Sequence, residues 1–404
     1  MMKKILSLLL ATMMICSILT ACGGGKTTEP APEKPTTPAT DSNVTADDKD
    51  TLEGEIKIGV SAGITGVAPL EGQAMINTIT LACDIINNER GGVLGKKLVP
   101  VFEDDAYTTD GATNAVNKLA YDDKIVAMIG PHRSNCVVAT EAIFADAGIA
   151  TLTGGSSPTF YDFDHDYIFR TRVSDTYMAQ ACPQYLLENL GATKIAILYG
   201  TDDYGTSAYK VMEEYLKDKG VDYIAEGFNI GDTDMIGQLL KAKDSGCDGL
   251  AVWGHGAELA IIARQRKELG ITMPTVGSVG FSNAVFTGLA DEESANGLYS
   301  VGEYTLETDD PTILDFAKRY EEAFGMIPES HAGAYFDCAF LLAEAINRAG
   351  TTDREAIKDA LKETSGYSGI LGEMTCDDVR DMLHGALILK NDGLVPKMVD
   401  RLAF

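Results

Sequence analysis

The chain of 404 residues lacks the clustered cysteines and histidines on which metal and redox sites depend. Its eight cysteines form no CxxC pair, its five histidines are scattered, and no HExxH motif occurs. Zinc sites need such ligands at short, regular spacings. The sequence therefore predicts neither a resident metal ion nor a cofactor.

Positive charge is also scarce. Lys and Arg number 33 against 60 Asp and Glu, so the formal net charge is −27. Nucleic acids and anionic lipid surfaces would be repelled by such a chain. A small ligand is not excluded, because a few local groups set the field at its site.

A long uncharged apolar run occurs only at the N-terminus, over residues 5–21, after Lys3 and Lys4. A basic head, an apolar middle and small residues before a cleavage point are typical of an export signal, and the run is short for a membrane span. The LTAC sequence that ends at Cys22 resembles the lipobox of bacterial lipoproteins. This resemblance implies a signal peptide over 1–21 and a diacylglycerol on the Cys22 sulfur. An ordinary cysteine near an ordinary cleavage site is the alternative.

Residues 22–54 contain little that could fold. They are rich in threonine and proline and nearly free of large apolar side chains. Such a segment cannot bury enough surface to offset the entropy of ordering it. We therefore expect a disordered tether between the lipidated cysteine and a globular body outside the cytoplasm. Six cysteines remain in that body, and the sequence leaves open whether they form disulfides or stay as buried thiols.

Short, continuous apolar runs recur through residues 55–404, a length sufficient for two domains. Runs of this kind are typical of strands buried on both faces. Amphipathic helical patterns separate them, so we expect parallel sheets covered by helices on both sides. The expected strands lie at 56–60, 125–130, 149–153, 194–199, 249–253 and 274–278.

Two such series, 55–173 and 194–303, indicate two similar α/β lobes. The pattern then turns helical, and two short strands follow. The expected helices lie at 313–324, 332–349 and 354–363, and the short strands near 371–375 and 386–389.

Loops that follow buried strands are where open α/β sheets bind ligands. One of them, GVSAG at 59–63, matches the G-x-S-x-G pattern of hydrolases, but no later Asp and His are placed to complete a triad. Its glycine spacing misses the dinucleotide fingerprint, and GGVLGKK at 91–97 lacks the spacing of a P-loop. The sequence therefore does not predict an enzyme.

Several of these stretches together resemble one family. The segments IKIGVSAGITG, NNERGGVLGKK, IVAMIGPHRSN and KIAILYGTDDYGTSA are similar to the branched-chain amino-acid-binding proteins of bacterial ABC importers (leucine/isoleucine/valine type, periplasmic-binding-protein type I). The similarity extends over nearly all of residues 55–404. It implies two similar lobes, each a doubly wound, mostly parallel sheet flanked by helices, joined by a three-crossover hinge that closes over a small ligand.

The resemblance also implies where each lobe begins and ends. The expected crossovers lie near 173–175, 302–304 and 365–368. The expected lobes are 55–173 plus 304–366 for lobe 1, and 174–303 plus 367–404 for lobe 2.

By the same resemblance, ligand-binding residues come from loops of both lobes. Ser134 falls where the family presents a hydroxyl to the ligand carboxylate, and Gly155, Ser156 and Ser157 fall in the second carboxylate-holding loop. Tyr204 matches a tyrosine of the second lobe that covers the ligand. Each has a plainer alternative: Ser134 as a helix N-cap, the serine loop as a flexible turn, and Tyr204 as a packed turn residue.

The sequence departs from the family pattern in four places. Val279 stands where the amino-acid binders place the glutamate that holds the ammonium, and His255 lies near a replaced aromatic residue. Glu71 occupies the position of a first-loop tyrosine, and Tyr107 and Arg133 replace the first-lobe cysteine pair. Glu71, Arg133, His255 and Val279 are therefore candidate ligand contacts, and Arg133 would favour a second negative group on the ligand.

Loss of the ammonium-binding glutamate should cost a buried ammonium several kcal/mol unless another carboxylate replaces it. Asp175, in the sequence RVSD, matches the ammonium-binding aspartate of related receptor domains, although it could instead cap the helix that follows. Glu71 is the other substitute. If either carboxylate faces the cleft, the ligand is a zwitterionic amino acid. If neither does, it is a carboxylate or amide without an amine.

The sequence thus predicts a monomeric, extracytoplasmic solute-binding lipoprotein, anchored to the membrane by its lipid and without catalytic activity. It would capture an amino acid or a related carboxylate and deliver it to the permease subunits of an ABC importer. No nucleic-acid partner is expected. A ligand-sensing module for a separate receptor is the alternative.

Overall fold

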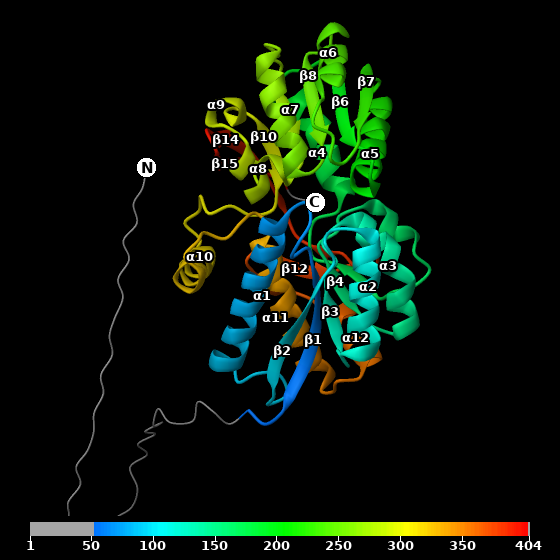
Figure 1. Cartoon of the computed structure of the whole chain (residues 1–404), viewed down its shortest axis with the longest axis vertical. Coiled ribbons are helices and arrows are strands. Elements are labelled where there is room, and N and C mark those ends of the chain that lie inside the picture. The colour runs from blue at the N-terminus through cyan, green and yellow to red at the C-terminus, as the bar shows by residue number, and fades with distance from the viewer. Residues whose placement is uncertain (1–51, 403–404) are drawn as a thin grey trace, which may run out of the picture. The chain divides into compact units, whose positions relative to one another are not determined.

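The computed structural model describes residues 52–402 (Figure 1). The expected signal peptide, Cys22 and nearly all of the expected tether lie outside these residues. The described part folds as two α/β lobes, the lower and the upper in Figure 1, which we call lobe 1 and lobe 2. Within it, we find no helix with the length and apolar character needed to cross a membrane.

Lobe 1 is built on a five-stranded parallel sheet in the order β2-β1-β3-β4-β5. Its strands are β1 (Glu55–Ala62), β2 (Lys97–Asp104), β3 (Ala127–Ile129), β4 (Thr151–Thr153) and β5 (Ile168–Arg170). Successive side chains of a strand point to opposite faces, so Met128 belongs to one apolar cluster and Ile129 to another. Helices therefore cover both faces, namely α1 (Pro69–Glu89) and α11 (Ala332–Ala349) on one, and α2 (Thr109–Asn117) and α3 (Ser134–Ala147) on the other.

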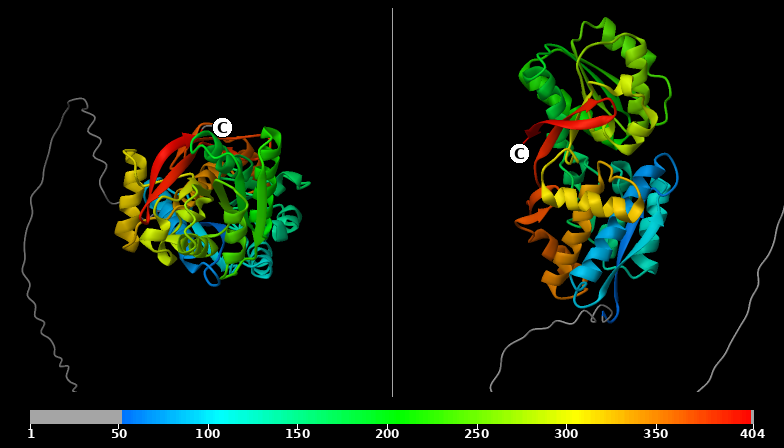
Figure 2. Two further views of the ribbon diagram at one scale, coloured as in Figure 1. Left: turned by 90° about the horizontal axis from the view of Figure 1, so that it is seen from above. Right: turned by 90° about the vertical axis from the view of Figure 1, so that its left-hand side faces the viewer.

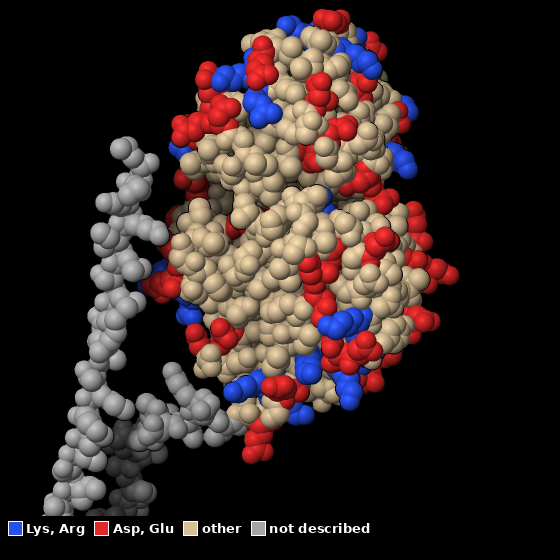
Figure 3. Space-filling model, viewed as in Figure 1, with Lys and Arg blue, Asp and Glu red and all other residues tan. Residues whose placement is uncertain are grey.

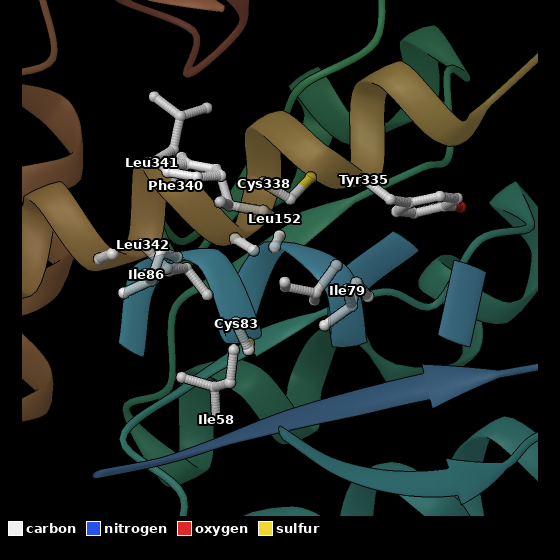
Figure 4. Packing of buried hydrophobic residues seen from close by; sticks show 14 of the residues in the cluster. Ile58, Ile79, Cys83, Ile86, Leu152, Tyr335, Cys338, Phe340, Leu341 and Leu342 are labelled. Carbon is white, nitrogen blue, oxygen red and sulfur yellow. The ribbon is translucent and has the colours of Figure 1, made fainter. Parts of the chain in front are cut away.

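An apolar cluster of lobe 1 fills the space between the sheet and helices α1 and α11 (Figure 4). Ile58 of β1, Ile79 and Cys83 of α1 and Leu342 of α11 are each at most 2% exposed. Full burial of one aliphatic side chain contributes about 1.5–3 kcal/mol. The cluster thus fixes the sheet on which the strand-end loops are mounted.

Lobe 2 has a seven-stranded sheet in the order β15-β14-β10-β9-β8-β6-β7. Its parallel strands are β6 (Ile195–Gly200), β7 (Tyr223–Phe228), β8 (Gly249–Trp253), β9 (Thr275–Gly277) and β10 (Tyr299–Gly302). The helices are α4 (Asp175–Glu188) and α5 (Asp203–Lys219) on one face, and α6 (Ile236–Asp244) and α7 (Gly256–Glu268) on the other. A C-terminal antiparallel hairpin, β14 (Ala386–Asp392) and β15 (Val395–Leu402), completes the sheet and is the red ribbon in Figure 2.

The predicted α/β class is confirmed, with two mostly parallel sheets that helices flank on both faces. Each of the six apolar runs expected as strands overlaps an observed strand, namely β1, β3, β4, β6, β8 or β9. The helices expected late in the chain are α10 (Pro311–Phe324), α11 and α12 (Arg354–Lys362). The two short strands expected near 371–375 and 386–389 correspond to β12 (Gly372–Cys376) and β14. The strands that were not expected are β2, β5, β7, β10, β11 (Tyr367–Gly369), β13 (Met382–Leu383) and β15.

The segment after α12 differs from its expected place. β11 (Tyr367–Gly369), β12 (Gly372–Cys376) and β13 (Met382–Leu383) form a small antiparallel sheet whose apolar side chains join the core of lobe 1. The buried Asp337 of α11 holds this sheet, because it accepts hydrogen bonds of 2.9 Å from the backbone N–H groups of Ile370 and Leu371. Of the segment 367–404 expected in lobe 2, only the β14–β15 hairpin joins the lobe 2 sheet.

The third crossover accordingly lies at residues 384–385, later than the expected 365–368. There the Nε2 atom of His384 lies 3.0 Å from the carbonyl oxygen of Thr171, which belongs to the first crossover. The second crossover follows β10 and begins at Glu303. The chain therefore passes between the lobes three times, as expected.

The face of the molecule in Figure 3 carries acidic groups on both lobes and fewer basic ones. A nucleic acid or an anionic membrane would meet repulsion there. The six described cysteines are free thiols, and five of them are buried, so they behave as small apolar core residues.

Candidate functional site

Loops from both lobes enclose a small cavity of about 30 Å³. They include the loops after β3 and β4 of lobe 1 and after β8 and β9 of lobe 2, at the carboxyl ends of the strands. Eight of the ten expected ligand-binding residues line the cavity, namely Glu71, Arg133, Ser134, Gly155, Ser156, Tyr204, His255 and Val279. Ser157 and Asp175 do not line it.

The remaining lining residues were not singled out from the sequence: His132, Gly154, Arg172, Gly254, Gly280, Asn283 and His331. Most lie in the same strand-end loops as the expected residues, so the loop argument already pointed to them. His331 carries no such signal, because it precedes α11, far along the chain from those loops.

The lobe 1 wall includes Ser134, the first residue of α3. The N-cap of this helix is Arg133, so the alternative that Ser134 serves as the N-cap is wrong. Ser134 Oγ accepts a hydrogen bond of 3.3 Å from the backbone N–H of Ser157, which leaves its own proton for a group in the cavity. The hydroxyl and the helix N-terminus together favour an anionic oxygen at this wall.

Two glycines bring the loop after β4 close to its neighbours. A Cβ atom at Gly154 would lie 2.4 Å from the Tyr335 hydroxyl oxygen, and one at Gly155 would lie 2.8 Å from the Phe160 ring. Neither position can therefore take a larger residue without a shift of a packed aromatic side chain. The backbone of this loop is therefore closely packed against aromatic side chains of lobe 1.

The two serines of this loop have different surroundings. Ser156 lines the cavity, and its buried Oγ has no hydrogen-bond partner among residues 52–402. Ser157 points across to lobe 2, where its Oγ lies 3.0 Å from Ser207 Oγ of α5. Ser157 is thus a contact between the lobes, whereas Ser156 lines the cavity beside the buried carboxyl of Asp175, whose pKa the Ser156 hydroxyl lowers.

Asp175 lies outside the cavity lining and is fully buried. The cap of α4 is Ser174, whose Oγ accepts a hydrogen bond of 3.2 Å from the Thr176 N–H. Neither carboxylate oxygen of Asp175 has a hydrogen-bond partner in the described chain. Burial raises the pKa of Asp175 to about 7, and the nearby Arg172 guanidinium and the Ser156 hydroxyl offset this only in part. The structure places Asp175 in neither of its expected roles, ammonium contact or helix cap.

Glu71 connects the two lobes at the cavity. It is buried in the first turn of α1, although a single glutamate in a loop is usually solvated. Its Oε1 accepts a hydrogen bond of 2.8 Å from Asn283 Nδ2, and Asn283 caps α8 (Ala284–Leu289) of lobe 2. Its Oε2 lies 3.7 Å from Arg133 Nη2.

Arg133 and Tyr107 are in contact where the family resemblance implies a cysteine pair. The guanidinium carbon lies 4.7 Å from the centroid of the Tyr107 ring, and both residues are buried. This cation–π contact links the loops after β2 and β3, as a disulfide would. The buried Nε of Arg133 has no hydrogen-bond partner among the described residues.

A buried ion pair joins the first two crossovers. Arg172 Nε donates to Glu303 Oε2 at 2.8 Å, and Glu303 Oε1 accepts from the Val173 N–H at 2.5 Å. Burial opposes the charge on Glu303, but the guanidinium outweighs it and holds the pKa of Glu303 below its usual value. The Nη1 group of Arg172 donates to the Gly154 carbonyl, which couples the crossover to the cavity wall.

The lobe 2 wall consists mainly of aromatic rings and glycine backbone, with the side chains of Val279 and Asn283. The Tyr204 and His255 rings stack with centroids 5.1 Å apart, and His255 Nε2 lies 2.8 Å from Asp202 Oδ2. Burial alone would raise the pKa of Asp202, but His255 outweighs it and holds that pKa below its usual value. Val279 lines the cavity as an aliphatic side chain, with no carboxylate at this family position.

His132 contributes a neutral ring to the lobe 1 wall. Burial, followed by the neighbouring His331, Arg172 and Arg133, holds its pKa well below the usual value. Its Nδ1 is hydrogen-bonded to the Tyr335 hydroxyl. At neutral pH it therefore presents imidazole and adds no positive charge.

The site has the character of a binding site. Ser61, the serine of the G-x-S-x-G pattern, is buried away from the cavity lining, and its hydroxyl donates to Asp105 Oδ2 at 2.8 Å. Burial of Asp105 raises its pKa, and the serine hydroxyl serves as its partner. Ser61 is thus not exposed at an elbow as a hydrolase nucleophile would be.

A family model described as periplasmic binding protein matches residues 55–390. The chain belongs to the periplasmic binding protein family. Proteins of this family bind solutes outside the cytoplasm, and they are binding proteins and not enzymes.

Two relatives of this periplasmic binding protein carry names that refer to amino-acid binding. A Leu/Ile/Val-binding protein homolog 2 of Brucella abortus is 25% identical over 325 residues, which are 80% of this chain and 86% of that protein. A leucine-, isoleucine-, valine-, threonine- and alanine-binding protein of Pseudomonas aeruginosa is 24% identical over 333 residues, 81% of this chain and 87% of that protein.

Solved structures share the fold. The branched-chain amino acid transporter substrate-binding protein LivJ of Streptococcus pneumoniae, in complex with isoleucine, superposes with a TM-score of 0.78 and 26% identity, over 85% of this chain and 99% of that one. A solute-binding protein of an ABC transporter from Rhodopseudomonas palustris, in complex with 3,4-dihydroxybenzoic acid, gives a TM-score of 0.77 at 20% identity, over 86% and 97% of the two chains.

Proposed function

We propose that this periplasmic binding protein is the solute-binding component of an ABC importer and captures an amino acid or a related carboxylate between its lobes. The observation that supports this most is one cavity lined by strand-end loops of both lobes. A ligand there would touch both lobes at once, so its binding free energy would favour the closed arrangement.

Among residues 52–402, few side-chain hydrogen bonds join the two lobes at or beside the cavity. They include the hydrogen bond from Asn283 to Glu71, at 2.8 Å, and the contact between Ser157 and Ser207, at 3.0 Å. Each such bond contributes about 0.5–1.5 kcal/mol, or more where one partner is charged. Contacts of this size can break and re-form as the lobes open for the ligand and close over it, which a cavity of about 30 Å³ requires.

The lobe 1 wall is suited to a carboxylate. Ser134 has a free hydroxyl proton at a helix N-terminus, and Arg133 and Ser156 have buried polar atoms without a partner among residues 52–402. Hydrogen bonds that involve a charged group are stronger than neutral ones. Lobe 2 would then cover the bound solute with Tyr204.

The closed, loaded form is the state that a permease would recognise, and Cys22 would keep it at the membrane. We include the lipid anchor at Cys22, the tether and a monomeric state in the proposal. The branched-chain ligands named for the relatives and the aromatic acid of the Rhodopseudomonas protein make amino acids and amine-free carboxylates the two classes to test.

The experiment is a thermal-shift screen of amino acids and organic acids, followed by small-angle scattering with each ligand that raises the melting temperature. We expect a hit to reduce the radius of gyration, since closure makes the molecule more compact. Ser134→Ala should weaken binding, and Ser368→Ala, a serine exposed on β11, is the matched control. No shift with either class, or binding insensitive to Ser134→Ala, would contradict the proposal.

A further inference from the structure

The cavity offers little to an aliphatic side chain. Among the residues that line it, Val279 is the single aliphatic one, and the glycines contribute only backbone. A branched hydrocarbon placed there would remove water from polar groups without replacing their hydrogen bonds, which costs free energy. The lining therefore disfavours leucine, isoleucine and valine.

Arg133 has hydrogen-bonding capacity that the described chain does not use. A guanidinium has five N–H donors, yet this one makes an ion pair with Glu71 at 3.7 Å and lies over the Tyr107 ring. The side chain is 6% exposed, and its Nε has no hydrogen-bond partner among residues 52–402. An anionic oxygen inside the cavity suits this planar donor group best.

A second guanidinium, that of Arg172, reaches the cavity from the first crossover. Glu303 and the Gly154 carbonyl engage its Nε and Nη1. Its Nη2 is buried and has no hydrogen-bond partner in the described chain. The cavity therefore has two guanidinium groups, each with an unused donor, on different elements.

The carboxylates at the cavity are already engaged. Glu303 holds Arg172 and the Val173 N–H, and Glu71 accepts from Asn283. The hydroxyls of Ser134 and Ser156 add further donors to the same lining. Among the residues that line the cavity, unused donors thus exceed unused acceptors, so the missing partner is a group rich in oxygen acceptors.

We propose that the ligand is a short solute with two acidic groups, one held near Arg133 and the other near Arg172. This inference rests on the proposed function and specifies its ligand class. A dicarboxylate and an acidic amino acid share this chemistry. Glu71, which lines the same cavity, would be the partner for an amine if the ligand carries one.

The test is isothermal titration calorimetry on the whole mature protein, with matched probes. The diacid probes are succinate, glutarate, L-aspartate and L-glutamate. The monoacid probes, which have one carboxyl group each, are butyrate, L-valine, L-leucine and 3,4-dihydroxybenzoate. We expect at least one diacid to bind at least about tenfold more tightly than every monoacid, as expected for one extra hydrogen bond to a charged group. Comparison of glutarate with L-glutamate then shows whether the ligand is a dicarboxylate or an acidic amino acid.

A pair of arginine variants separates a local contact from a change of net charge. Arg133→Met should weaken the diacid at least about tenfold and change monoacid binding little. Arg319→Met is the matched control, because its guanidinium lies on α10 and pairs with Glu89 and Asp315. It should leave the affinity within about twofold. If Arg133→Met does not fold, Arg133→Lys takes its place. This variant keeps the positive charge but lacks the planar guanidinium, so it should also weaken diacid binding.

The outcomes distinguish the two proposals. Tightest binding by L-leucine, L-valine or a monoacid would overturn this inference and leave the proposed function intact, because a ligand would still occupy the cavity. Equal diacid affinities for Arg133→Met and Arg319→Met would also overturn it. No binding of any probe to folded protein would overturn both.

Discussion

The two walls of the cavity differ in chemistry although the two lobes share an architecture. The lobe 1 wall presents a carboxylate, a guanidinium and two serine hydroxyls, from Glu71, Arg133, Ser134 and Ser156. The lobe 2 wall presents mainly the stacked rings of Tyr204 and His255 and the backbone of glycines. Directional groups determine which ligand fits, whereas rings and backbone mostly exclude water. Lobe 1 would therefore select the ligand and lobe 2 would cover it.

The largest expected effect is at the point where the walls meet. Arg172→Met leaves Glu303 buried without its counter-charge, which should lower the free energy of unfolding by about 3–5 kcal/mol. Urea titration followed through Trp253, the single tryptophan of the chain, measures this change. The control Arg319→Met should have a free energy of unfolding within about 1 kcal/mol of that of the unmodified protein. An equal, small effect of both substitutions would show that the crossovers do not depend on the pair.

Asp175 should make stability depend on pH. The pKa of this buried carboxyl is raised to about 7 from 3.8, so between these values the folded state retains a proton that the unfolded chain has lost. The contribution of Asp175 to the free energy of unfolding therefore falls as pH rises through this window, by as much as about 4 kcal/mol.

The variant Asp175→Asn cannot ionise and should lose this decline. Urea titrations near about pH 5 and near about pH 8 would show a smaller difference for the variant than for the unmodified protein. Asp378→Asn, in the exposed turn after β12, is the matched control. A decline of the same size in both variants would assign the pH dependence to other groups.

Affinity tests the asymmetry of the walls directly. Ser156→Ala removes a buried hydroxyl from the lobe 1 wall and should weaken binding of an anionic ligand about tenfold or more. Val279→Ala, on the opposite wall, should change it only about threefold, because it removes little apolar contact. Calorimetry with the tightest ligand of the screen measures both. A larger loss for Val279→Ala would reverse the assignment of roles.

The smallest effect is expected at the contact between the lobes. Ser207→Ala removes the partner of Ser157 and should favour the open arrangement by about 0.5–1.5 kcal/mol. Small-angle scattering without ligand should then give a larger radius of gyration, and the affinity should fall a few-fold. Ser294→Ala, in a short helix of lobe 2 away from the cavity lining, is a control, because its hydroxyl donates a comparable local hydrogen bond to Asp291. No change in the radius would mean that this contact does not hold the lobes together.

The strands that contain a continuous apolar run can be predicted from the sequence. β8, with the sequence GLAVW, is buried at every position, and a strand of this kind is visible in the sequence as a continuous apolar run. β2 does not, because its positions are mostly half-buried and it contains Pro100, which an edge strand tolerates. β7, an edge strand of the lobe 2 sheet, is likewise mostly half-buried and was not expected from the sequence.

The part of the site that strand-end loops form can be predicted from the sequence. The part that the crossovers form cannot. Arg172 and Glu303 meet only because two crossovers run side by side, and no local spacing encodes a partner 131 residues away. Asp175 illustrates the opposite error. Its neighbour Ser174 takes the cap, so the carboxylate turns inward, and a sequence cannot show which of two adjacent polar residues does so.

The position of the third crossover has a consequence for the history of the molecule. Because β11 to β13 pack on lobe 1 and only the terminal hairpin returns to lobe 2, each lobe is assembled from separate stretches of the gene. A single recombination between two family members cannot exchange one intact lobe. Exchange of the covering wall, whose residues Tyr204, His255 and Val279 lie between the first and second crossovers, would need two recombination points.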